Sequence, residues 1–313
     1  MLSTRKILIG TRGSKLALSQ ADEVKQLIIS QYPEYQKSPE LISITSFKTT
    51  GDKIIDKSLV DIGGKGLFIK EIEEALLDGR IDIAVHSMKD VPGFFSSGLD
   101  IFAIPTRKDP RDAFISNQYY SIANLPLNAT IGTSSPRRSA LVLNQRPDLK
   151  IVNFRGNIDT RLSKLQDKQV DATILAVAGL TRIKMQNRIT TIIDAQEMLP
   201  AVGQGALALQ ARSSDAFMIK ILEPLNNQAS KVCVDAERAF LKTINGSCKT
   251  PLAAYCQIQN DQLFLQVLLS SFDGKEIYKT SRTGGLRDSI KIGNDAGEEL
   301  KKVGKYILDN LNG

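Results

Sequence analysis

Short apolar runs alternate with helical patterns over the first two thirds of the chain. The apolar run at residues 7–9 predicts a strand, and Ala17, Ala21, Val24 and Ile28 follow it at spacings of four, three and four. These spacings place the four side chains on one face of a helix. The alternation of strand and helix starts again in the middle of the chain. Two such blocks predict two α/β domains with parallel sheets.

The same patterns predict the other elements of these two blocks. Helices are expected from Pro136 onward and after Asn157, which is a favoured N-cap residue. A third helix is expected at residues 67–77. Short apolar runs that fit strands occur at residues 41–47, 81–85, 101–104, 129–132, 151–154 and 172–177.

The C-terminal part of the chain has a different pattern. Asp273-Gly274 is a turn signal that separates two expected strands. This mixture of elements predicts a third, small α+β domain. Its expected elements are a helix over residues 232–244, strands over residues 263–269 and 276–280, and a final helix that carries Leu300, Val303, Ile307 and Leu311.

Composition narrows the class of protein. The chain has 313 residues, of which 42% are hydrophobic and 24% charged, values typical of globular proteins. No apolar run approaches the roughly 18 residues that span a membrane, and no signal-peptide segment is recognised, so we expect a cytoplasmic protein. The net charge of +7 fits an anionic ligand, nucleic acid or no particular partner. The absence of Trp weakens the case for a base-stacking surface.

Cations recur just after the predicted strands, where ligands bind in open α/β sheets. The N-terminus of a helix disfavours cations, so Arg137 and Arg138 in a first turn indicate a bound anion. Alternatively, the arginines could reach surface carboxylates, but their recurrence favours a ligand with several carboxylates or phosphates. The cations at these junctions are Arg12, Lys89, Arg137, Arg138, Arg155, Arg161 and Arg182.

Two further residues near the strand ends are candidates for chemistry. Asp90 follows a predicted strand and is a candidate acid, base or electrostatic stabiliser. Alternatively, it forms an ion pair with Lys89 or caps a helix. His86 is the only histidine, and its place in an apolar strand favours a core residue over a metal ligand.

The three cysteines have no metal-ligand spacing and no disulfide pattern. Cys248 lies in a turn-rich segment beside Lys249, which favours a thiolate, so it is a candidate nucleophile or attachment point. Cys233 and Cys256 lie in apolar surroundings that are typical of core residues.

Several of these strand-end residues belong to longer motifs. The motifs are Val85-His86-Ser87-Met88-Lys89-Asp90-Val91-Pro92, Gly132-Thr133-Ser134-Ser135-Pro136-Arg137-Arg138, Arg155-Gly156-Asn157 with Arg161, Leu175-Ala176-Val177-Ala178-Gly179-Leu180, Pro200-Ala201-Val202-Gly203-Gln204-Gly205, and the turn at residues 246–248. Together they resemble the motifs of the porphobilinogen deaminase (hydroxymethylbilane synthase) family. They occur in the same order over nearly the whole chain, which makes the resemblance specific.

The resemblance implies an enzyme that joins four porphobilinogen molecules head to tail and releases ammonia. Its product is the linear tetrapyrrole hydroxymethylbilane. A dipyrromethane cofactor, one per chain and thioether-linked to Cys248, primes the reaction and is retained. We expect a small-molecule substrate, no nucleic acid or membrane partner, and a monomer. The alternative is a non-catalytic anion-binding protein with the periplasmic-binding-protein fold.

The resemblance also implies the domains. Two α/β domains resemble type II periplasmic binding proteins, and a small α+β domain follows them. The expected boundaries are residues 1–104 with a return segment at 200–222 for the first domain and 105–199 for the second. Residues 223–313 form the third domain, which carries the cofactor cysteine.

The resemblance assigns site residues by matching position, with no metal among them. Asp90 matches the catalytic aspartate, whose carboxylate would stabilise the cation left when ammonia departs. The expected cofactor-binding residues are Cys248, Lys89, Asp90, Ser134, Arg137, Arg138, Arg155 and Gly156. The expected substrate-binding residues are Arg12, Ser14, Phe68, Arg155, Arg161, Arg182 and Gln204.

Three positions depart from the family pattern. Asp61 stands where a Lys is usual, which puts a cationic role there in doubt. Pro136 replaces a Leu, and proline suits the first turn of a helix. Ser247 replaces a Gly, which would be unfavourable if that position needs a positive φ.

Overall fold

The computed structural model describes residues 5–49, 69–247 and 249–312. They divide into two compact units, each with its own sheets and hydrophobic cores. Of the described residues, the first unit comprises 5–49, 69–107 and 206–231. The second unit comprises residues 108–205 and those from 232 onward.

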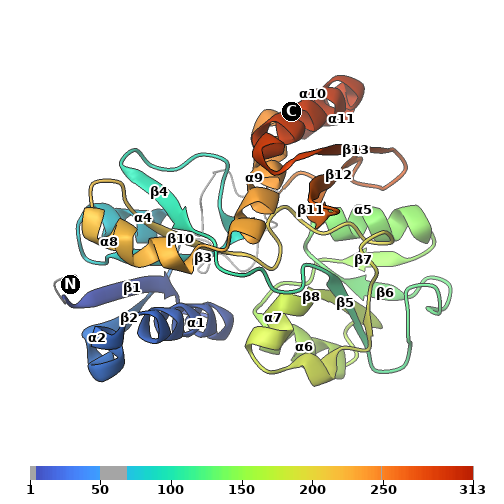
Figure 1. The fold of residues 1–313 in the computed structure, drawn as a ribbon. Helices are drawn as coiled ribbons and strands as arrows, with labels where there is room; N and C mark the ends of the chain where they lie inside the picture. The colour runs from blue at the N-terminus through green and yellow to red at the C-terminus, as the bar shows by residue number, and fades with distance from the viewer. Residues whose placement is uncertain (1–4, 50–68, 248, 313) are drawn as a thin grey trace. The chain divides into compact units, whose positions relative to one another are not determined.

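The first unit is built on a five-stranded sheet with the order β2-β1-β3-β10-β4 (Figure 1). Strand β1 is parallel to β2 and β3, whereas β10 is antiparallel to β3 and β4. The carboxyl ends of β1 and β3 therefore lie at the same edge of the sheet. The strands are β1 (Ile7–Arg12), β2 (Ile42–Phe47), β3 (Ile83–Ser87), β4 (Leu99–Ala103) and β10 (Leu207–Arg212).

Helices of this unit pack on the sheet through the faces that the sequence predicts. Ala17, Ala21, Val24 and Ile28 of the first helix are all buried, as their spacing indicates. Ala21, Val24 and Ile28 share a hydrophobic core with side chains from β1, β2, β3 and β10. The helices are α1 (Lys15–Gln31), α2 (Pro33–Lys37), α4 (Lys70–Leu77) and α8 (Ala216–Leu222), and 3₁₀ turns span Pro39–Leu41, Met88–Asp90 and Glu223–Leu225.

The second unit contains a five-stranded sheet with the corresponding arrangement, β7-β6-β8-β5-β9. Its strands β5, β6, β7 and β8 are labelled in Figure 1. Strand β6 is parallel to β7 and β8, and β5 is antiparallel to β8 and β9. The predicted α/β class is therefore confirmed. The strands are β5 (Asp112–Ser116), β6 (Thr130–Gly132), β7 (Lys150–Val152), β8 (Ala172–Ala176) and β9 (Thr191–Ile192).

The expectation of parallel sheets is wrong, because each five-stranded sheet is mixed. Strands β5 and β10 pair antiparallel with β8 and β3, from which many residues separate them along the chain. No single helical crossover links these partners, so the constraint that makes consecutive β-α-β strands parallel does not apply. The apolar pattern of the sequence predicts no strand at residues 112–116 or 207–212.

Three helices of the second unit follow its parallel strands. Ser135 caps the first of them and Pro136 is its first residue, as the sequence predicts. Asn157 caps the next helix, and its side chain accepts a hydrogen bond from the Thr160 N–H. The helices are α5 (Pro136–Gln145), α6 (Ile158–Gln166) and α7 (Val177–Arg182), followed by a 3₁₀ turn at Gln186–Arg188.

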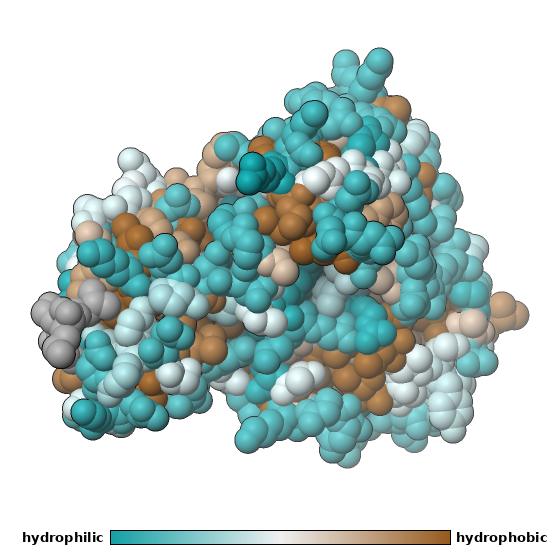
Figure 2. Space-filling view, in the orientation of Figure 1, coloured by the Kyte–Doolittle hydropathy of each residue, from teal (hydrophilic) through white to brown (hydrophobic). Residues whose placement is uncertain are grey.

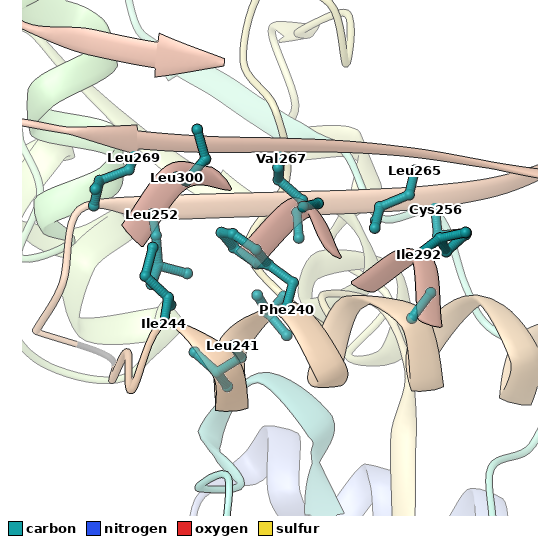
Figure 3. Packing of buried hydrophobic residues seen from close by; sticks show 14 of the residues in the cluster. Phe240, Leu241, Ile244, Leu252, Cys256, Leu265, Val267, Leu269, Ile292 and Leu300 are labelled. Atoms are coloured by element: carbon teal, nitrogen blue, oxygen red, sulfur yellow. The ribbon is translucent and has the colours of Figure 1, made fainter. Parts of the chain in front are cut away.

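The C-terminal residues form the predicted α+β arrangement. An antiparallel sheet with the order β11-β12-β13 packs against helices through an apolar core (Figure 3). Phe240 is fully buried there, and Cys233 and Cys256 lie in the same core, which confirms the prediction for both cysteines. The elements are α9 (Gln228–Thr243), β11 (Leu252–Gln259), β12 (Gln262–Ser270), β13 (Ile277–Gly285), a 3₁₀ turn at Leu286–Asp288, α10 (Ser289–Val303) and α11 (Lys305–Asn312).

The final helix is divided into two parts, and this differs from the prediction. Gly304 ends α10, and a Cβ atom at this position would lie 2.4 Å from the Leu269 side chain. Only glycine permits so close an approach between the helix end and the sheet. The apolar pattern in the sequence therefore continues across Gly304, although the packing of this residue against Leu269 ends the helix there.

Hydrogen bonds fasten the C-terminal elements to the rest of the second unit. The fully buried carboxylate of Glu237 on α9 accepts from the Gly203 N–H at 2.7 Å and from the Cys256 N–H at 2.9 Å. The Asn144 amide of α5 donates to the Gly274 carbonyl at 2.9 Å. These contacts tie helix α5 and the segment around Gly203 to the antiparallel sheet.

Apolar side chains lie mainly in the cores of the described part of the chain. Figure 2 shows hydrophilic residues over most of the visible face, with hydrophobic residues in separate groups between them. Tyr120, Leu127 and Tyr306 are the most exposed of the large hydrophobic residues. None of the described helices is both long and apolar enough to cross a membrane.

Candidate functional site

Four predicted site residues of the first unit lie at one edge of its sheet. Arg12 is the last residue of β1, and Ser14 caps α1 by accepting a hydrogen bond from the Ala17 N–H at 3.2 Å. Lys89 and Asp90 lie in the 3₁₀ turn that directly follows β3. Because β1 and β3 are parallel neighbours, the structure brings these four residues to the same sheet edge.

Gln20 and Ala206, which no sequence motif indicates, hold the segment just before Lys89 and Asp90 in place. The amide of Gln20, which is buried on α1, donates to Ser87 Oγ at 2.8 Å. Ser87 Oγ lies 3.1 Å from the Gln20 amide oxygen. The Met88 N–H donates to the Ala206 carbonyl at 3.0 Å. The turn is therefore anchored immediately before Lys89.

His86 belongs to a buried polar chain, which confirms its interpretation as a core residue. Its Nε2 lies 3.1 Å from the Gln210 side-chain oxygen, and the Gln210 amide donates to Glu73 at 2.7 Å. Ser96 donates to the other oxygen of Glu73 at 2.7 Å. Burial lowers the pKa of His86, although the nearby charge of Asp90 acts in the opposite direction. A neutral imidazole fits this environment.

In the second unit, Ser134 lies where β6 and β7 end. Its hydroxyl donates to Asn153 Oδ1 at 2.6 Å and accepts from the Phe154 N–H at 3.0 Å. Asn153 was not singled out from the sequence. These bonds fix the orientation of Ser134 just before helix α5.

Arg137 and Arg138 share one buried carboxylate, Asp112. Arg138 donates to Asp112 Oδ1 from Nε at 3.1 Å and from Nη2 at 2.7 Å. Arg137 Nη1 lies 2.8 Å from Asp112 Oδ2. The sequence suggests surface carboxylates as the alternative partners, whereas the partner is fully buried and lies at the start of β5. The one sequence signal for it is an acidic residue directly before an apolar run.

The charges of Asp112, Arg137 and Arg138 do not cancel. Burial by itself raises the pKa of Asp112, but Arg137 and Arg138 outweigh burial and hold this pKa well below its ordinary value. Asp112 is therefore ionised, and two guanidinium cations face one carboxylate. The three side chains retain one net positive charge away from water, an arrangement that an anionic ligand would stabilise.

Arg155, Gly156 and Arg161 form a second positive group in the same unit. Arg161 Nε donates to the Gly156 carbonyl at 2.9 Å, and Lys164 donates to the Arg155 carbonyl at 3.3 Å. Burial and repulsion from Arg138 and Arg155 lower the pKa of Arg161 to about 10. Repulsion between neighbouring cations fits a binding site for a ligand with several carboxylates.

Removing one of these charges should stabilise the ligand-free protein. The pKa of Arg161 is lower in the folded chain than in the unfolded chain, so its charge destabilises the fold below pH 10. This penalty is relieved as pH rises through that value. We expect Arg161→Gln to raise the free energy of unfolding by about 1 kcal/mol at pH 7, since the side chain is partly exposed and screened.

Urea denaturation of the cofactor-free protein checks this prediction. Arg188→Gln, elsewhere in the same unit, is the matched control, and its effect should stay within about 0.5 kcal/mol. A loss of stability in Arg161→Gln would mean that its bond to Gly156 outweighs the repulsion.

The backbone at Gly156 requires glycine. Its φ is +120°, and a Cβ atom there would lie 2.8 Å from the Thr160 side chain. We expect Gly156→Ala to lower the free energy of unfolding by about 1–3 kcal/mol, measured by urea denaturation. Gly13→Ala is the control, because its Cβ would lie 4.0 Å from Ser46, its nearest neighbour among the described residues. Equal effects of the two substitutions would contradict the prediction.

Arg182 and Gln204 both contact groups of the second unit. Arg182 is the last residue of α7, where a cation is favourable, and it donates to the Gly205 carbonyl at 3.2 Å. Its place differs from the helix start that the sequence suggested. The buried Gln204 amide donates to the Pro110 carbonyl at 2.6 Å and to Asp112 Oδ1 at 3.0 Å. Gln204 is therefore a further partner of the carboxylate that holds the two arginines.

Cys248, Phe68 and Asp61 lie outside the described residues. Next to Cys248, the Ser247 N–H donates to Thr250 Oγ1 at 3.1 Å, and Ser247 Oγ accepts from the Lys249 N–H at 3.2 Å. Ser247 is not among the described residues with positive φ, so serine is accommodated without backbone strain. Pro136 likewise sits at a favourable first helical position.

Two family models, which describe domains of the same enzyme family, match different parts of the chain. The family model described as "Porphobilinogen deaminase, dipyromethane cofactor binding domain" matches residues 7–220. The model described as "Porphobilinogen deaminase, C-terminal domain" matches residues 231–302. These two matches cover most of the chain.

Curated relatives are similar over nearly their full length. Porphobilinogen deaminase from Syntrophobacter fumaroxidans is 44% identical over 311 residues, which are 99% of each chain. Porphobilinogen deaminase from a Wolbachia of Drosophila simulans is 50% identical over 296 residues, covering 94% of this chain and 98% of its own. A solved periplasmic substrate-binding protein from Coxiella burnetii aligns with 72% of this chain and 94% of its own, at 14% identity and a TM-score of 0.43.

Proposed function

Because the chain belongs to the porphobilinogen deaminase family, it is a transferase that makes hydroxymethylbilane, and we propose which of its residues bind and which react. It condenses four porphobilinogen molecules head to tail and releases ammonia, a step of tetrapyrrole biosynthesis. Its cofactor is dipyrromethane. The non-catalytic alternative has no support among the relatives.

The observation that carries the assignment of binding residues is the excess of buried and partly buried cations in the second unit. Porphobilinogen bears an acetate and a propionate, so both the substrate and the growing chain are polyanionic. Arg137 and Arg138 outnumber the one carboxylate that they share, and Arg155 repels Arg161. Ligand carboxylates would supply the missing negative charge.

The cofactor fits this chemistry. Its own acetates and propionates match guanidinium groups, and when bound it supplies the pyrrole carbon to which the first substrate is joined. We assign Cys248 to the thioether on the family's sequence pattern alone. The other proposed cofactor-binding residues are Lys89, Asp90, Ser134, Arg137, Arg138, Arg155 and Gly156.

Asp90 is the proposed catalytic residue. Departure of ammonia from porphobilinogen leaves a positive charge delocalised over the pyrrole, and a nearby carboxylate stabilises that charge. The same carboxylate can accept a hydrogen bond from a pyrrole N–H or transfer a proton. The anchoring of the chain at Ser87, directly before this turn, supports a fixed backbone position for Asp90.

Substrate carboxylates are assigned to cations and hydroxyls near the strand ends. Arg12 and Ser14 share a sheet edge with Asp90, which supports a role close to the reacting group. Gln204 acts beside Arg138 through their shared contact with Asp112. The proposed substrate-binding residues are Arg12, Ser14, Phe68, Arg155, Arg161, Arg182 and Gln204.

We also propose three domains, with the boundaries that the sequence suggests. The common strand order of the two five-stranded sheets supports residues 1–104 with 200–222 and residues 105–199 as two related domains. The separate antiparallel sheet supports residues 223–313 as the third. We further propose that the enzyme is monomeric and cytoplasmic and has no nucleic-acid partner.

A direct assay tests the function. The purified chain is incubated with porphobilinogen, and ammonia and tetrapyrrole are both measured. One hydroxymethylbilane for each four ammonia molecules is the expected stoichiometry. Binding of porphobilinogen without release of ammonia would instead support the anion-binding alternative.

A further inference from the structure

We propose that Asp112 is a positioning residue for cofactor attachment: it orients Arg137 and Arg138 together and leaves the pair one positive charge for a ligand carboxylate. This inference rests on the proposed function, which places both arginines at the cofactor. Asp112 itself does not contact the ligand in this proposal.

The geometry fixes both guanidinium groups from two sides. Asp112 contacts Arg138 through Oδ1 and Arg137 through Oδ2, at 2.7 and 2.8 Å. Arg138 Nη1 also donates to the Ile174 carbonyl at 2.8 Å, and Arg137 Nη1 donates to the Leu199 carbonyl at 2.8 Å. Each arginine therefore has one anchor on the carboxylate and one on the backbone, which restricts its orientation.

Asp112, Arg137 and Arg138 are buried, so an unbalanced charge among them is unfavourable. Asp112 is fully buried, and the side chains of Arg137 and Arg138 are 4% and 7% exposed. Arg137 Nε is buried and has no hydrogen-bond partner among the residues that the structure describes. A group that served only to stabilise the fold would be expected to balance its charges and satisfy its donors. This group does neither, and a ligand carboxylate would supply the missing charge.

Asp171 is a carboxylate of the same sheet region that accepts hydrogen bonds from a threonine instead of contacting arginines, as far as the described residues extend. Its Oδ2 accepts from the Thr130 N–H and from the Thr130 hydroxyl, both at 2.7 Å. Asp171 thus ties its own position to the start of β6, whereas Asp112 contacts two cations. Asp171→Asn is therefore the matched control for Asp112→Asn.

Cofactor loading measures the proposed role without requiring turnover. The full chain is produced in cells that cannot make porphobilinogen, then incubated with porphobilinogen. The mass of the denatured chain is followed with time, and the melting temperature of each cofactor-free variant is recorded. We expect Asp112→Asn to load at least about tenfold more slowly than the wild type, because both arginines lose their common anchor. Asp171→Asn should load at the wild-type rate, with a comparable fall in melting temperature.

Two results would overturn the inference while leaving the proposed function intact. One is loading of Asp112→Asn within about twofold of the wild type. The other is an equal slowing in Asp171→Asn, which would show that loading follows stability alone. The absence of any mass gain in the wild type would overturn the proposed function as well.

A second variant covers the case in which Asp112→Asn does not fold. Arg138→Lys keeps the positive charge but has no Nε–H and Nη2–H pair to donate to Asp112 Oδ1. The proposal predicts loading at least about tenfold slower than the wild type for this variant too. Loading within about twofold would show that charge suffices and that the anchor on Asp112 has no positioning role.

Discussion

Asp90→Asn is expected to lower turnover by about 100- to 1,000-fold, the range typical for loss of one electrostatic stabiliser of a transition state. Asparagine has nearly the same shape but no charge, so it cannot stabilise the cation that forms when ammonia leaves. Because Asp90 lies in a turn anchored through Ser87, we expect the fold and the covalent cofactor to remain. Initial rates of porphobilinogen consumption and the intact mass of the variant test both statements.

Asp100→Asn is the matched control for this experiment. Asp100 is an exposed carboxylate on β4 of the same unit, and its side chain accepts a hydrogen bond from the neighbouring Ile101 N–H. Its removal should leave turnover unchanged. Near-normal turnover in Asp90→Asn would remove Asp90 from the mechanism.

Cys248→Ser should abolish turnover altogether. Without the thiol, no thioether can form, and the reaction has no retained primer. We expect no hydroxymethylbilane above the background of the uncatalysed reaction, measured under conditions in which the wild type reaches completion. Cys233→Ala is the control, because Cys233 lies in the C-terminal core and should affect stability only. Full activity of Cys248→Ser would place the attachment point elsewhere.

Short-range sequence patterns correctly predicted helix starts and the buried face of α1. The buried face of α1 follows from its apolar spacing, and the starts of α5 and α6 follow from Ser135-Pro136 and Asn157. Capping and amphipathic spacing act within one or two helical turns, so they can be recognised in a short window of sequence.

Strands β5 and β10 were missed because their structure depends on distant partners. Strand β5 pairs with β8, and β10 pairs with β3, across long stretches of chain. Their short apolar runs lack the regular alternation that would mark them as strands. The direction of these strands in the sheet also depends on topology, which explains why the parallel expectation was wrong.

The candidate site likewise combines residues that a local pattern indicates with residues that only the fold brings together. Its cations could be predicted, because their positions after strands are visible in the sequence. Their partner could not be predicted, since Asp112 meets Arg138 only after β5 has joined the sheet beside β8. Gln20, Asn153 and Asp112 act on site residues through the folded arrangement, and no motif marks them.

The intact mass of the purified, denatured chain tests the central claim most directly. It is measured for the wild type and for Cys248→Ser, each after incubation with porphobilinogen. The account predicts a mass excess equal to one dipyrromethane on the wild type and none on the variant. No excess on the wild type, or an equal excess on both proteins, would contradict the claim that Cys248 carries the cofactor of this enzyme.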